Sequence, residues 1–273
     1  MLYITGDCHG NVINRLSYKN YPHWRELNQL NSSSNQFSSS PDQSLTITQQ
    51  SNFVFILGDV GLGWPGYEKD TDYQLKALSR KPFTIICIAG NHDNYDYLDT
   101  LPLIFPSFLL KGEIKETPQY PNILWIDRSA ILNINEKTIL CIAGAKSHDT
   151  KYIFEPSDKL SIKRAKKHKI PYRINHKTWW EREAIDVPHL KNTLSSSIGL
   201  NYIFSHDAPA KFNKIAKELD PLNSYQDNEG ELYLDLLDNT LQFDHWYHGH
   251  YHFENLTWLK NHTCIYYKIL ELC

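Results

Sequence analysis

The chain has 273 residues, enough for one domain with a sizeable core, and its 28 basic and 31 acidic side chains give a formal net charge of −3. This balance excludes a general attraction to nucleic acid or to an anionic membrane, so any anionic ligand must be bound locally. Five cysteines without CxxC spacing argue against a disulfide framework and against a thiolate zinc site. Without a basic leader or a membrane-length apolar run, we expect a cytoplasmic protein that makes no membrane contact.

Short apolar segments along the chain have the length and the continuous apolarity of strands that are buried on both faces. In chain order they are residues 2–5, 53–57, 83–89, 123–126, 138–143, 201–204 and 264–270. Helical periodicity occurs at residues 70–80, 160–169, 179–185 and 210–219. This mixture predicts a single α/β domain over residues 1–273.

Two polar stretches interrupt this pattern. Residues 28–52 are rich in Ser, Asn and Gln and have almost no aliphatic side chains, a composition too polar to build a core. We therefore expect a disordered surface insertion at 28–52. Residues 220–231 are predicted to form a second loop.

Ligand-type side chains follow several predicted strands directly. They occur in the blocks Gly6-Asp7-Cys8-His9-Gly10, Gly58-Asp59, Gly90-Asn91-His92-Asp93, Ser205-His206 and Gly249-His250-Tyr251-His252. Carboxylates and imidazoles suit Mn²⁺, Fe or Zn²⁺, whereas a calcium loop would be all oxygen. Because alternate residues of an extended segment face the same side, Asp7 with His9 and His250 with His252 can each direct two ligands to one place.

These blocks, in this order, resemble the calcineurin-like metallophosphoesterase superfamily, whose pattern is GDxH, GD, GNH[ED], a lone His and GHxH. The resemblance covers nearly the whole chain. It implies a four-layer sandwich, in which two mixed β-sheets are flanked by helices, and the hydrolysis of a phosphate ester. Residues 144–149, 172–174 and 179–183 also resemble a narrower group of bacterial and phage-type members.

The resemblance assigns a role to each block. One metal ion would be bound by Asp7, His9 and His252, a second by Asn91, His206 and His250, and Asp59 would bridge both. His92 matches the catalytic histidine of the superfamily, and Asp93 would orient it. The expected cofactors are two divalent transition-metal ions, with Mn²⁺ favoured over Fe or Zn²⁺.

The middle of the chain offers two candidates for binding the substrate. Arg173 could hold a phosphate bidentately, although an isolated surface arginine does so in a minority of cases. His148, between Ser147 and Asp149, could lie on a loop beside the site or could belong to a helix cap. Residues 58–64 lack the second Asp and the Arg of the GDxxDRG motif, which argues against a protein Ser/Thr phosphatase.

A phosphomonoester is the favoured substrate, and two alternatives stay open. The first is a nuclease or cyclic-nucleotide phosphodiesterase, for which the basic residues in 159–169 are the only indication; a solvated helix face explains them more simply. The second is a catalytically silent metal-binding interaction module, and the intact ligand set argues against it. Nucleic acid is therefore a less favoured partner, and no obligate protein partner is evident.

Overall fold

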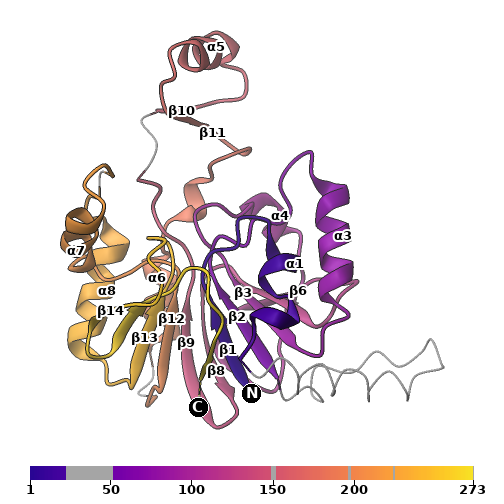
Figure 1. The fold of residues 1–273 in the computed structure, drawn as a ribbon, viewed down its shortest axis with the longest axis vertical. Coiled ribbons are helices and arrows are strands. Elements are labelled where there is room, and N and C mark those ends of the chain that lie inside the picture. Colours follow the sequence, from indigo (N-terminus) through magenta and orange to yellow (C-terminus); the bar gives the residue numbers. More distant parts are fainter. Residues whose placement is uncertain (23–51, 149–151, 196–197, 224, 273) are drawn as a thin grey trace.

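The computed structural model describes residues 1–22, 52–148, 152–195, 198–223 and 225–272 (Figure 1). The insertion expected at 28–52 lies outside these ranges, except for its last residue. Within the described ranges, no helix has both the length and the apolar character needed to cross a membrane.

The first sheet has seven strands, with four parallel strands at its centre. Its order is β16-β1-β2-β3-β7-β6-β4, formed by Leu270–Leu272, Leu2–Thr5, Phe53–Leu57, Thr84–Ile88, Ile123–Ile126, Ile114–Glu116 and Leu103–Ile104. Strands β1, β2, β3 and β7 are parallel and fully buried, as their apolar sequences predicted. Strands β16 and β6 pair antiparallel with the two sides of this group, and β4 lies beyond β6.

The second sheet repeats this plan. Its order is β14-β15-β13-β12-β9-β8-β5, formed by Leu256–Leu259, His262–Cys264, His245–His248, Tyr202–Ser205, Lys137–Ile142, Ser129–Ile134 and Leu109–Gly112. Strands β15, β13, β12 and β9 are parallel, whereas β14 and β8 pair antiparallel at the two sides. Each sheet therefore presents a set of parallel strand ends at one edge.

Helices cover the outer face of each sheet (Figure 1). On one side lie α1 (Val12–Arg15), α3 (Glu68–Leu78) and α4 (Tyr95–Asp99); on the other lie α6 (Val187–Thr193), α7 (Phe212–Leu219) and α8 (Glu229–Thr240). Between the sheets, Phe55 of β2 packs edge-on against Phe204 of β12, with ring centroids 5.0 Å apart. The expected four-layer sandwich of two mixed sheets flanked by helices is confirmed.

A small projection rises from the body above the strand ends (Figure 1). This arm, residues 152–174, consists of the parallel strands β10 (Tyr152–Phe154) and β11 (Tyr172–Ile174) with α5 (Lys159–Lys167) between them. Just beyond it, His176 contacts the Asp96 carboxylate on α4 at 2.9 Å. The base of the arm is thus attached to the first helical layer.

Three sequence predictions of secondary structure are wrong. Residues 264–270 form no single strand, because β15 ends at Cys264 in one sheet and β16 begins at Leu270 in the other. Residues 179–185 contain only the 3-10 turn η3 (Glu181–Glu183). The loop predicted at 220–231 ends early, since α8 begins at Glu229 with a capping box formed by Asn228 and Glu231.

Candidate active site

The proposed metal ligands come from strand ends of both sheets. In the first sheet, Asp7, Asp59 and Asn91 follow β1, β2 and β3 within three residues. In the second sheet, His206 directly follows β12, and His250 follows β13. Parallel strands end at the same edge of a sheet, so these side chains meet where the two edges come together.

Asp7, His9 and His252 form a first cluster whose possible ligand atoms all lie within 4.8 Å of one another. His252 Nε2 is 3.0 Å from Asp7 Oδ2 and 3.0 Å from His9 Nε2. Two imidazole nitrogens that converge beside a carboxylate oxygen form a donor set suited to a transition-metal ion.

A second cluster, of Asp7, Asp59 and His206, overlaps the first. His206 Nε2 lies 3.3 Å from Asp59 Oδ1 and 3.1 Å from the side-chain oxygen of Asn91. His206 Nδ1 faces the carbonyl oxygen of Leu57 at 2.9 Å, so a proton on Nδ1 leaves Nε2 available as a ligand.

Asp7 belongs to both clusters, whereas the resemblance gave the shared position to Asp59 alone. The carboxylate of Asp59 still lies between the two groups, because its Oδ2 is 3.9 Å from His9 Nε2. His250 completes the second group: its ring centroid is 5.0 Å from that of His206, and its backbone N–H donates to Asp7 Oδ1. The structure thus brings the predicted ligands together, with two carboxylates at the centre.

Two observations fit these residues to divalent cations. Asp7 Oδ2 is buried, and no donor in the described part of the chain makes an aligned hydrogen bond to it. Burial alone would raise the pKa of Asp59, but the neighbouring His206 lowers it below its usual range. Burial alone would likewise lower the pKa of His206, yet Asp59 raises it to about 10. The buried Asp59 is therefore ionised beside a positive charge, which a metal ion would supply in place of the proton on His206.

The glycines of the blocks make room for ligands from other blocks. A Cβ on Gly58 would lie 1.8 Å from Nδ1 of His206, and one on Gly90 would lie 2.2 Å from Oδ1 of Asp59. Both contacts are far shorter than any that real atoms allow, so each position needs glycine. These glycines therefore allow the ligand side chains of one block to approach the backbone of another closely.

Several ligands also have strained backbones. The φ angles of His9, Asp59, His250 and His252 are 46°, 45°, 65° and 57°, in the left-handed region that non-glycine residues seldom adopt. Such strain persists only where the surrounding structure imposes it, and it is concentrated at functional sites.

His92 stands beside both clusters. Its backbone N–H donates to Asp59 Oδ1 at 2.7 Å, and its ring centroid is 5.7 Å from that of His9. Asp93 is fully buried, and its carboxylate accepts hydrogen bonds from the backbone N–H groups of Val60, Gly61 and Gly90. Asp93 therefore stabilises the turn that carries Asp59. Because Asp59 accepts the backbone N–H of His92, the same turn also fixes the backbone of His92.

Both candidates for substrate binding lie at the site. Arg173, on β11 of the arm, places Nη2 3.4 Å from His92 Nε2. The ring of His148 lies 5.0 Å from that of His250 and 4.9 Å from that of Tyr225.

Sequence reasoning missed three supporting residues. Asn91 Nδ2 donates to Ser147 Oγ at 3.0 Å, and the buried Glu183 accepts the backbone N–H of Ser147 at 2.8 Å. The buried guanidinium of Arg15 donates to the carbonyl oxygens of Gly6, Asp7 and Tyr266, residues that no sequence pattern links to it. An arginine within the apolar first helix was the only signal for this contact.

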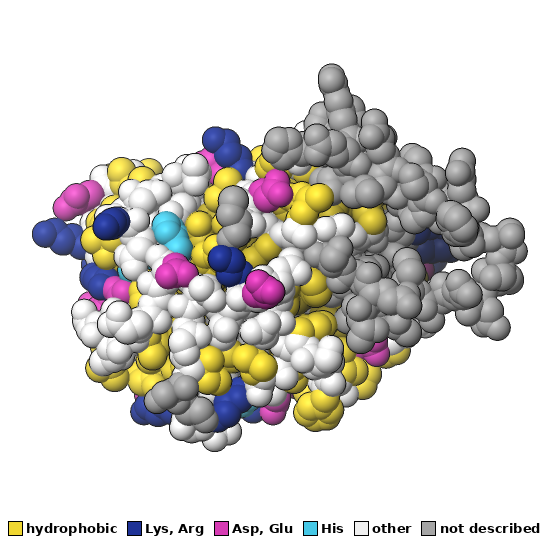
Figure 2. Space-filling view, turned by 90° about the horizontal axis from the view of Figure 1, so that it is seen from below, with side chains coloured by type: hydrophobic (Ala, Val, Ile, Leu, Met, Phe, Trp, Pro, Cys, Tyr) yellow, Lys and Arg dark blue, Asp and Glu magenta, His cyan; other side chains and the backbone are white. Residues whose placement is uncertain are grey.

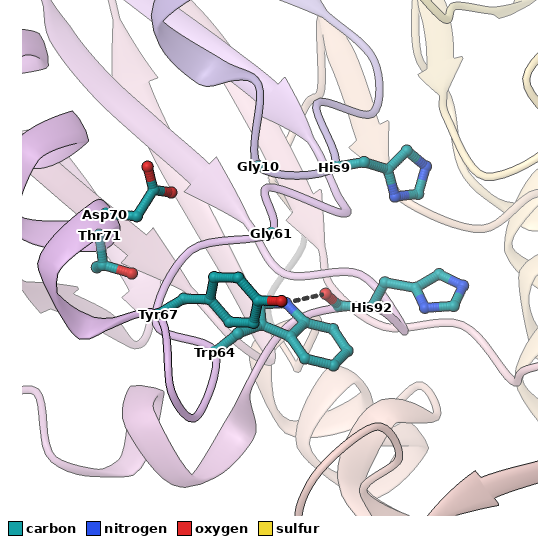
Figure 3. Close-up of a pocket in the computed structure, with 8 residues that line it drawn as sticks. All are labelled: His9, Gly10, Gly61, Trp64, Tyr67, Asp70, Thr71 and His92. Atoms are coloured by element: carbon teal, nitrogen blue, oxygen red, sulfur yellow. Dashed lines mark hydrogen bonds between the residues drawn. The ribbon is translucent and has the colours of Figure 1, made fainter.

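A cavity of about 360 Å³ opens beside His9 and His92. Figure 3 shows it between these two histidines and the N-terminal end of α3. Its walls are formed by His9, Gly10, Gly61, Trp64, Tyr67, Asp70, Thr71 and His92. The indole Nε1 of Trp64 donates to the carbonyl oxygen of His92 at 3.2 Å, which links the cavity wall to the catalytic candidate.

The chain is similar to known proteins in structure and in sequence. The chain is similar to the solved structure of phosphopantetheinyl hydrolase from Mycobacterium tuberculosis, with 13% identity and a TM-score of 0.45 over 97% of this chain and 87% of that one. It is also similar to a protein of unknown function from Aquifex aeolicus, with 18% identity and a TM-score of 0.24 over 68% of this chain and 83% of that one. No curated protein gives a significant match. The sequence profile of the calcineurin-like phosphoesterases matches residues 2–254, so the chain belongs to this family of metal-dependent phosphoester hydrolases.

Proposed function

We propose that the protein hydrolyses phosphate monoesters at a centre of two divalent metal ions, of which Mn²⁺ is favoured over Fe and Zn²⁺. The observation that carries this proposal is the pair of overlapping clusters, which share the carboxylate of Asp7 and have Asp59 between them. Together the clusters hold two carboxylates and three imidazoles, which is more than a single four-coordinate ion takes.

Each ion has its own set of ligands in this proposal. One ion would be held by Asp7, His9 and His252 and the other by Asn91, His206 and His250, and Asp59 would bridge the two positions. When bound, the pair of ions would lower the pKa of a water molecule and neutralise charge on the phosphoryl group. Burial holds the pKa of His250 well below its usual range, so its imidazole is neutral and able to coordinate.

The remaining residues would bind the substrate, protonate the leaving group or support the group that does so. His92 donates a proton to the leaving oxygen, and Asp93 holds the turn beneath it. Arg173 reaches the same space as His92, where its planar guanidinium can bind two phosphoryl oxygens. His148 lies next to His250, where it could contact the substrate.

A second candidate, a nuclease or cyclic-nucleotide phosphodiesterase, is favoured by one observation. Helix α5 of the arm carries the exposed residues Lys163, Arg164, Lys166 and Lys167 above the site. On the face opposite the arm, acidic and basic side chains are interspersed, and no broad basic patch is visible in its described part (Figure 2). A silent binding module is disfavoured, because the ligand clusters and His92 are all present.

The direct test is an assay of phosphomonoesters, phosphodiesters and short nucleic acids with added Mn²⁺, with and without a chelator. We expect turnover of monoesters that the chelator abolishes and that Mn²⁺ restores. Turnover confined to diesters or nucleic acids would favour the second candidate. Absence of any hydrolysis, with two ions bound, would favour the silent module.

A further inference from the structure

The cavity beside His92 lies where the alcohol part of a substrate must sit if the proposed function holds. A general acid has to reach the leaving oxygen, so the group attached to that oxygen occupies the space next to His92. The cavity opens there, and its volume of about 360 Å³ falls within the range of small-molecule sites. Trp64 donates a hydrogen bond to the carbonyl oxygen of His92. The indole wall of the cavity therefore has a fixed position relative to His92, the proposed general acid.

The walls of the cavity favour a flat ring. Trp64 is held by an edge-on contact with the buried Trp180, whose ring centroid is 5.5 Å away, while Tyr67 is 66% exposed beside the cavity (Figure 3). Part of the lining is backbone, because Gly10 and Gly61, which have no side chains, belong to it. Aromatic side chains next to open backbone suit a planar group that can stack.

A carboxylate lies on the α3 side of the cavity. Asp70 Oδ2 accepts a hydrogen bond from Gln74 at 2.9 Å, and Oδ1 has no hydrogen-bond donor among the described residues. No lysine or arginine belongs to the described lining. A second phosphate on the substrate would therefore be repelled, whereas an amino or hydroxyl group could donate to Asp70.

We propose that this cavity binds the alcohol part of the substrate and selects a planar ring carrying a hydrogen-bond donor, as in a nucleoside 5′-monophosphate, over an aliphatic alcohol or an alcohol bearing another phosphate. Tyr67 and Trp64 contact the ring, and Asp70 accepts its donor group. This selectivity rests on the proposed hydrolysis of monoesters, because it places the leaving group beside His92.

The test compares kcat/KM for adenosine 5′-monophosphate, ethyl phosphate and adenosine 3′,5′-bisphosphate. We expect the first to exceed the second by roughly tenfold or more through stacking, and to exceed the third by roughly tenfold through repulsion from Asp70. Tyr67→Ala should lower the ratio of kcat/KM for adenosine 5′-monophosphate to that for ethyl phosphate. Asp70→Asn should lower the ratio of kcat/KM for adenosine 5′-monophosphate to that for the bisphosphate.

Helix α3 offers matched controls. Tyr73 is also 66% exposed, and Asp72 lies two residues from Asp70; neither lines this cavity. Tyr73→Ala and Asp72→Asn should leave both ratios as in the unmodified protein.

The outcomes separate this inference from the function on which it rests. Equal kcat/KM values for the three esters, unchanged by Tyr67→Ala, would overturn the inference and leave monoester hydrolysis standing. If no ester is hydrolysed, calorimetric titration with adenosine decides. Binding that Tyr67→Ala weakens and Tyr73→Ala does not would support the cavity assignment, and absence of binding would overturn it.

Discussion

Asn91 Nδ2 donates a hydrogen bond to Ser147 Oγ over 3.0 Å, and the same side chain presents its oxygen to His206 Nε2 at 3.1 Å. The first contact orients the amide so that its oxygen, rather than its nitrogen, faces the proposed second metal position. Ser147 therefore acts on that position without belonging to its ligands.

Removing this contact should weaken metal binding. Ser147→Ala frees the Asn91 amide to rotate, and loss of such supporting contacts typically lowers metal affinity about 10–100-fold. Calorimetric titration with Mn²⁺ would measure the change, with Ser157→Ala, an exposed serine on the arm, as the control. Unaltered affinity in Ser147→Ala would show that the amide is oriented by other contacts.

Asp59→Asn should abolish activity and reduce the content of both metals. Removing the charge between the two groups weakens both positions at once and leaves His206 without its acidic partner. Elemental analysis would measure the metal content. Two ions retained at the affinity of the unmodified protein would contradict the bridging role.

His92→Asn should leave both metals bound and reduce turnover according to the leaving group. General acid catalysis contributes about 10²–10⁴-fold, and it matters most when the leaving oxygen is strongly basic. We expect a loss of about 10²-fold or more on alkyl phosphates and a much smaller loss on nitrophenyl phosphate. Equal losses on both would remove His92 from this role, and loss of a metal ion would make it a ligand.

Metal binding should release a proton at neutral pH. In the metal-free site Asp59 raises the pKa of His206 to about 10, against the opposing effect of burial, so the imidazole is charged at pH 7. Coordination requires the neutral imidazole, so affinity should rise about tenfold per pH unit between pH 7 and 9. Calorimetry at pH 7 in buffers of different ionisation enthalpy measures the released proton. A binding enthalpy independent of the buffer would contradict this prediction.

Charge reversal on α5 should have little effect on phosphomonoesters. Replacing Lys163, Arg164, Lys166 and Lys167 with Glu changes the arm, whereas the proposed metal ligands lie on the strand ends of the body. Contacts to a phosphate backbone would instead make turnover strongly dependent on salt. A steep loss of turnover confined to nucleic-acid substrates, with the metal content unchanged, would favour the nuclease.

The features best predicted from the sequence are those set by neighbouring residues in the chain, namely the buried strands and the residues that follow them. Strands β1, β2 and β3 are buried on both faces, so their apolar segments were recognisable, and the ligand residues follow them directly. The family motifs then predicted both sheets and the residues that meet between them. The same local logic failed at residues 264–270, because only Lys268 interrupts the apolar pattern where the chain passes from one sheet to the other.

Contacts between distant segments could not be predicted in this way. Asp7 joins both clusters only because the ends of β1, β2, β12 and β13 come together in space. Glu183 in η3 and Ser147 in an irregular segment are 36 residues apart, with the whole arm between them in the sequence. No periodicity or motif encodes such pairs, which become visible only in the folded chain.

The position of His206 against Gly58 makes the proposed metal centre an interface between the two sheets. The imidazole from the second sheet occupies the space where any larger residue in the first would place its Cβ. Among related chains, positions 58 and 206 should therefore vary together, with a side chain at 58 found only where 206 has become small. A substitution at either position would change how the two sheets pack together. The ligands from both sheets would then be displaced at the same time.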